Sequence, residues 1–228
     1  MRFPRLLRNV VPLLVGGMLV TAAPAMAAPG ACAALGGAVE AGEICRIQAR
    51  EPAYTMDVTF PLGYPDEQAI VDYLGQTREG FVNIAGIPDA RVMPYQMDVT
   101  AESFQSAQTR SVVLTLFQDV GSAHPTTWFK SFTYDVNRGR PVTFDTLFAP
   151  DAKPLDAIFP VVQRQLETDT GLVGSISPGD GRDSSHYQNF AVTDDAVIFF
   201  FGRAELLPSF AGETSVTVPR DQIPPLQL

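Results

Sequence analysis

The sequence has 228 residues, with 25 acidic and 16 basic side chains, two histidines, two cysteines and a formal charge of −9. Such an acidic chain repels phosphate backbones and anionic lipid headgroups, which argues against nucleic acid and membrane surfaces as partners. A basic protein would be attracted to it instead.

The first 27 residues have the organisation of a secretory signal peptide. Three arginines precede an apolar stretch, residues 10–23, and Ala25-Met26-Ala27 forms a small-x-small cleavage pattern. An uncleaved anchor helix is the alternative, but it needs roughly 20 apolar residues and this stretch is shorter. Cleavage after Ala27, or one residue later, leaves residues 28–228 as a single secreted domain. Its formal charge is −12, because the removed segment 1–27 contains three arginines and no acid.

Cys32 and Cys45 lie close together near the start of the mature chain. In an oxidising compartment an isolated pair of this kind is most simply one disulfide. Closing such a loop contributes on the order of 3 kcal/mol in the chain-entropy model. A redox pair or a metal site is the alternative, but the CxxC spacing and neighbouring histidines are missing, so we predict a structural bridge and no metal.

Alternating apolar and polar residues predict a half-buried strand over residues 54–60, with Tyr54, Met56, Val58 and Phe60 on one face. Pro65, followed by two acids, opens a helix. Gly86 and Pro88 close it. Its predicted apolar face consists of Ile70, Tyr73, Leu74, Phe81 and Ile84.

Further strands are predicted at residues 95–99, 112–117, 128–134, 197–201 and 216–218. The runs 112–117 and 197–201 are apolar on both faces, which is typical of interior strands, and we expect both in the same sheet. A second helix has apolar residues at helical spacing from Leu155 to Leu166, and Pro160 either bends it or marks its start. The grouping of strands and helices predicts an α+β fold, a mostly antiparallel sheet packed with two main helices.

The residues give little indication of catalysis. His186 lies in a polar loop beside Asp180 and Asp183, but acidic loops are usually solvated turns, and a metal site needs a convergent ligand set. The G-x-S-x-G elbow of serine hydrolases is missing, although a triad of distant residues stays open. No phosphate loop or dinucleotide fingerprint occurs, so we predict no cofactor.

Four blocks carry a resemblance to a known family. They are residues 119–127 (DVGSAHPTT), 140–148 (RPVTFDTLF), 187–201 (YQNFAVTDDAVIFFF) and 205–220 (ELLPSFAGETSVTVPR). With them the chain resembles the mycobacterial secreted immunogenic proteins, a family of culture-filtrate antigens. That family is related to the extracellular domain of lysozyme-sensing anti-sigma factors and to a domain of some peptidoglycan deacetylases. The resemblance implies a β-grasp-like α+β fold, secretion and no established catalytic residues, although some members are labelled esterases.

His124 permits two interpretations. It is either a turn histidine that bonds the backbone, or part of a recognition surface with Pro125 and Trp128, where an exposed tryptophan beside a rigid turn would be an anchor. A sole tryptophan is more often a core residue. We predict a secreted, extracellular, monomeric, non-enzymatic protein that binds a host or envelope protein, with cell-envelope association left open. The alternative is a secreted esterase or carbohydrate-active hydrolase, which would need a pocket with titratable groups around either histidine.

Overall fold

The computed structural model describes residues 30–87, 94–122 and 124–228. The predicted signal peptide, residues 1–27, and the predicted helix stop at Pro88 lie outside the described residues. No helix within the described ranges is long and apolar enough to cross a membrane.

The N-terminal part of the described chain forms a seven-stranded sheet in the order β1 to β7. Neighbouring strands are antiparallel except β3 and β4, which are parallel because α2 crosses over between them. A short helix, α1, precedes the sheet. The elements are α1 (Ala31–Ala34), β1 (Ala38–Glu40), β2 (Ile44–Arg50), β3 (Tyr54–Pro61), α2 (Glu67–Ala85), β4 (Tyr95–Gln105), β5 (Thr109–Asp119), β6 (Thr126–Asp135) and β7 (Arg140–Pro141).

The predicted alternation in β3 is confirmed. Met56, Val58 and Phe60 are buried on one face of the strand, the fourth predicted residue, Tyr54, is half-buried, and α2 covers that face. The helix ends at Ala85 with Gly86 as its C-cap, as expected. The predicted apolar face is wrong at one position, since Ile84 is 40% exposed. Val71 and Ala85, which were not predicted, are buried. Cys32 and Cys45 form the expected disulfide, which ties α1 to β2.

The C-terminal part forms a second sheet of three strands in the order β10-β9-β8. The strand predicted at residues 197–201 is therefore interior, as expected, but it is the middle strand of this second sheet and does not join β5. Pro160 lies inside α4 and does not mark its start. The elements are α3 (Phe144–Leu147), α4 (Leu155–Thr170), η1 (Asp180–Arg182), η2 (Ser184–Tyr187), β8 (Phe190–Val192), β9 (Ala196–Phe201), η3 (Ser209–Ala211), β10 (Thr214–Pro219) and η4 (Arg220–Gln222).

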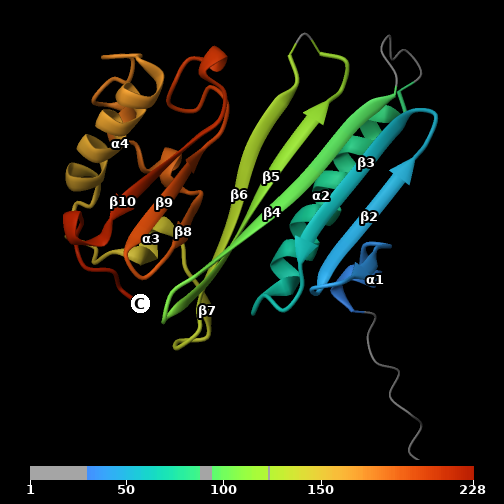
Figure 1. Ribbon diagram of the computed structural model, residues 1–228, viewed down its shortest axis with the longest axis horizontal. Coiled ribbons are helices and arrows are strands. Elements are labelled where there is room, and N and C mark those ends of the chain that lie inside the picture. Colours follow the sequence, from blue (N-terminus) through green and yellow to red (C-terminus); the bar gives the residue numbers. More distant parts are fainter. Residues whose placement is uncertain (1–29, 88–93, 123) are drawn as a thin grey trace, which may run out of the picture.

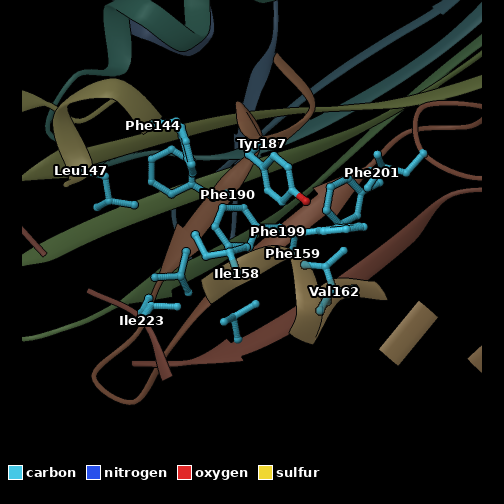
Figure 2. Close-up of a cluster of buried hydrophobic side chains, with 14 of the residues drawn as sticks. Phe144, Leu147, Ile158, Phe159, Val162, Tyr187, Phe190, Phe199, Phe201 and Ile223 are labelled. Carbon is cyan, nitrogen blue, oxygen red and sulfur yellow. The ribbon is translucent and has the colours of Figure 1, made fainter. Parts of the chain in front are cut away.

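The four layers run α4, small sheet, large sheet and α2 (Figure 1). One face of β9 packs with α3 and α4 into an aromatic-rich core around Phe144, Tyr187 and Phe199, which Figure 2 shows in close-up. The opposite face meets the large sheet through Val113, Phe200 and their neighbours. This arrangement confirms an α+β fold with a mostly antiparallel sheet and two main helices.

Hydroxyl groups join the two sheets. β8 is an edge strand, and the backbone N–H and C=O groups of Phe190 and Val192 on its free edge bond side-chain hydroxyls of the large sheet at 2.9 to 3.4 Å. This pairing replaces the missing neighbour strand, so the edge leaves no unsatisfied backbone groups. The hydroxyls belong to Thr109, Ser111, Ser131 and Thr133.

Candidate functional site

The turn between β5 and β6 is hydrogen-bonded to the segment that follows β9 of the small sheet. The Arg203 guanidinium donates to the carbonyl of Pro125 at 2.8 Å and to the carbonyl of Ser209 at 3.0 Å. The Arg203 backbone N–H also donates to Thr127 O, at 3.3 Å. This segment therefore covers the free edge of β6 and holds the turn in place.

His124 lies in this turn and is exposed. Its carbonyl accepts a hydrogen bond from Ser122 Oγ at 2.7 Å. Within the described residues no hydrogen bond engages the imidazole ring of His124 or His186. The ring of His124 is therefore available at the surface, and its role in recognition stays a prediction.

Phe210 lies beside the turn and was not among the predicted site residues. It belongs to η3, directly after Ser209, whose carbonyl shares the Arg203 guanidinium with Pro125. Its side chain is 76% exposed. The sequence does contain a signal, an aromatic residue within a short loop bounded by Pro208 and Gly212. We call His124, Pro125 and Phe210 the tip surface.

Trp128 is half-buried, which lies between the exposed anchor and the core residue that the sequence left open, and its part in recognition stays a prediction. Its indole N–H donates to the hydroxyl of Tyr73, on α2, at 2.9 Å, and its backbone packs against Gly202. Pro125 and Trp128 thus both lie against the Gly202-Arg203 segment. Trp128 links the tip surface to the flank of α2.

A row of aromatic rings, buried at Tyr64 and half-buried at the other positions, continues from Trp128 along β6 beside α2. Tyr73 meets Phe132 edge to face at 6.0 Å between ring centroids. Tyr64 meets both Phe132 and Tyr134 in the same manner, at 6.5 and 6.4 Å. Trp128, Phe132 and Tyr134 share one face of β6, because residues an even number of positions apart on a strand point to the same side. The aromatic row consists of Trp128, Phe132, Tyr134, Tyr64 and Tyr73.

Lys130 supplies a positive charge in the middle of the aromatic row. Its ammonium nitrogen lies 5.6 Å from the ring centroid of Tyr73 and 5.4 Å from that of Phe132. Both distances lie within the range of cation–π attraction. The row therefore combines aromatic area, hydroxyl groups and one cation on a rigid strand.

A pocket of about 470 Å³ adjoins the end of the row at Tyr64. It lies between residues 61–65 and the ends of β4 and β5, and its volume falls in the range of small-molecule sites. Burial raises the pKa of the Tyr64 phenol, and the nearby charge of Asp66 adds to this effect. Neither histidine lines the pocket.

The second histidine lies near a carboxylate with a perturbed pKa. Burial raises the pKa of Glu205, although the Gly202 N–H, which donates to Glu205 Oε2 at 2.6 Å, and the neighbouring His186 act in the opposite direction. Asp183 caps η2 by accepting from the Ser185 N–H at 2.9 Å. No cluster of three metal-ligating side chains occurs in the part of the chain that the structure describes.

Comparisons with known proteins place the chain among relatives. A model of the family "Protein of unknown function (DUF3298)" matches residues 145–221, which include α4 and the small sheet. The protein named Esterase Rv3036c, from Mycobacterium tuberculosis, is 54% identical over 209 residues, covering 90% of this chain and 92% of that protein. Immunogenic protein MPT64, also from Mycobacterium tuberculosis, is 42% identical over 222 residues, covering 96% of this chain and 95% of that protein.

A solved structure supports the fold. A DUF3298 family protein from Pseudomonas aeruginosa superposes with a TM-score of 0.56 at 13% identity, covering 81% of this chain and 94% of that chain. The expected relation to anti-sigma factors stays a prediction. Identity above 40% across nearly the whole length is the finding that decides the family, and the chain belongs to the mycobacterial MPT64 immunogenic protein family.

Proposed function

We propose that this is a secreted, extracellular, monomeric protein of antigen type that acts by binding another protein, from the host or the cell envelope, and that it is not an enzyme. The tip surface is its recognition site, with Phe210 as the anchor. The observation that supports this most is the 76% exposed side chain of Phe210 in η3. The Arg203 guanidinium holds this segment and the β5–β6 turn together by donating to the carbonyls of Ser209 and Pro125.

The composition of the surface supports a protein partner. Aromatic residues dominate binding hot spots because they bury a large area at a small cost in conformational entropy. Arg203 joins the turn that contains His124 to the segment that contains Phe210, and Trp128 follows the same turn in β6. A surface held by backbone hydrogen bonds is preorganised, which lowers the entropic cost of binding.

Two features support secretion. Residues 1–27 have the charge and hydropathy pattern of a cleavable signal peptide. The Cys32–Cys45 disulfide is of the kind that persists in oxidising compartments outside the cytoplasm.

The experiment that tests this proposal is a quantitative capture from host and envelope extracts with three immobilised proteins. They are the wild type, Phe210→Ser and Val173→Ser, the last a matched control because Val173 is 79% exposed in a loop after α4. A partner that buries Phe210 should bind the Phe210→Ser protein at least tenfold more weakly, since burying such a ring contributes about 1.5–3 kcal/mol. Equal capture of any specific partner by all three proteins would contradict the tip surface.

An esterase is the second candidate, and one observation favours it. The relative at 54% identity is named an esterase. Burial raises the pKa of the Glu205 carboxyl, which lies near His186, and acid–base catalysis uses carboxyl and imidazole groups of this kind. A hydroxyl nucleophile would need to lie within hydrogen-bond reach of an imidazole, and no such hydrogen bond joins the described residues.

A further inference from the structure

The pocket beside Tyr64 has features of a ligand site that go beyond protein recognition. It lies at the end of β6 opposite the tip surface, where Val136 follows the strand. Its floor comes from β4 and β5, and its wall from the segment between β3 and α2. Three distant parts of the chain thus meet around a volume of about 470 Å³.

In the described part of the chain, Arg110 is the only ionised side chain that lines the pocket. Its Nη1 donates to the carbonyls of Ser106 and Thr109, at 2.9 and 2.8 Å, so two backbone oxygens of the β4–β5 hairpin orient the guanidinium. Among the described residues no carboxylate lies within ion-pair distance of it. A fixed positive charge without a counter-charge, in an otherwise acidic protein, is complementary to an anion.

Part of the pocket lining is apolar. Tyr64 and Val112 are 7% and 3% exposed, and Val136 stands at the rim with 37% of its surface exposed. Ser103 and Gln105 add polar groups on the same side as Arg110. A site with apolar walls and a few placed polar groups is typical of small-molecule binding.

We propose that this pocket binds a small amphipathic monocarboxylate, with its carboxylate on Arg110 and its apolar body against Tyr64, Val112 and Val136. A single guanidinium matches one carboxylate in charge and in planar geometry. The apolar part of the lining favours an organic anion, because the hydrocarbon chain of such a ligand leaves water when it enters the pocket, a gain that inorganic phosphate or sulfate lacks. The site is independent of the tip surface, so a failure of the Phe210 experiment leaves it unaffected.

Octanoate is the probe, and octanol and octylammonium are its neutral and cationic counterparts of equal chain length. Titrations followed by two-dimensional amide NMR should show octanoate shifting the amides of Ser103, Gln105 and Val136. Octanoate should bind at least tenfold more tightly than octylammonium. Arg110→Gln should weaken octanoate binding about tenfold and leave octanol within about twofold, because a charged hydrogen-bond partner is lost.

Two further variants serve as controls. Arg164→Gln removes a charge from the exposed face of α4 and should leave octanoate binding unchanged. Ser103→Trp fills the pocket from an exposed strand position and should abolish binding of all three probes. Octylammonium binding as well as octanoate, shifts mapped outside the pocket, unchanged octanoate affinity in Arg110→Gln, or no shifts at millimolar octanoate would each overturn the proposal.

Discussion

At the scale of single residues, the contact between the two sheets depends on buried hydroxyls. Thr133 is 4% exposed, donates to the Phe190 carbonyl at 3.1 Å and lies 3.0 Å from Ser111 Oγ. An apolar side chain there would deprive the buried Phe190 carbonyl of this hydrogen bond and remove one of the two partners of Ser111 Oγ, which also accepts from the Val192 N–H. Polar residues in alternating strands are normally assigned to solvent, so this contact could not be predicted from the sequence.

Thr133→Val keeps the shape of the side chain and removes only its hydroxyl. We expect it to lower the free energy of unfolding by about 1–3 kcal/mol, the cost of leaving buried polar groups unpaired. Thr126→Val, at the exposed start of the same strand, should change stability by less than about 0.5 kcal/mol. Urea denaturation of both variants checks this, and equal effects would show that the hydroxyl contacts are not what holds β8 to the large sheet.

At the scale of elements, periodicity predicted what each strand or helix buries on its own. β3 and most of α2 follow their patterns because one clear face is apolar. The apolar run 197–201 indicated that both faces of the strand are buried. Its pattern does not specify which element buries each face, and these are α4 on one side and the large sheet on the other. β8 was missed because three residues, Phe190–Val192, are too few for a pattern.

The candidate site divides in the same way. Trp128 and the turn before it are adjacent in sequence, so the sequence could place them together. The pocket collects residues 61–65, 103–105, 110–112 and 136, and Arg203 connects the segment of Phe210 to the turn. Both depend on tertiary contacts between distant segments, which no local pattern contains.

The loop after α4 packs against the helix through a glycine. A Cβ atom on Gly181 would lie 1.9 Å from the ring of Phe159, and the Arg182 guanidinium covers the same ring at 4.9 Å. Gly181→Ala should therefore destabilise the protein by about 1–3 kcal/mol through overpacking. Gly179→Ala is the control, because its nearest neighbour would be Ser177 Oγ at 3.7 Å. Thermal unfolding should separate the two variants by several degrees, and coincident transitions would contradict this packing.

At the scale of the whole molecule, two buried tyrosines make stability depend on alkaline pH. Burial raises the pKa of the Tyr64 and Tyr187 phenols, and the Tyr187 hydroxyl also donates to Gly181 O at 2.7 Å. In the unfolded chain both ionise near pH 10. The folded state thus holds more protons above that pH, so the free energy of unfolding is highest below about pH 10 and falls as pH rises further.

Absorbance at 295 nm during an alkaline titration measures this directly. Tyr64 and Tyr187 should ionise only well above pH 10, together with loss of the folded circular dichroism signal. Ionisation of all six tyrosines in one step near pH 10, with the fold intact, would contradict the burial of these two phenols.

The central claim, that the molecule acts by binding and not by catalysis, is tested most directly by ester hydrolysis with the purified mature protein. Rates on short-chain p-nitrophenyl esters should be compared for the wild type, His124→Ala and His186→Ala, each corrected for a matched preparation without the protein. We predict no rate above background in the wild type, and therefore none for either substitution to remove. A background-corrected rate that vanishes in His124→Ala or in His186→Ala would contradict the account and establish the esterase.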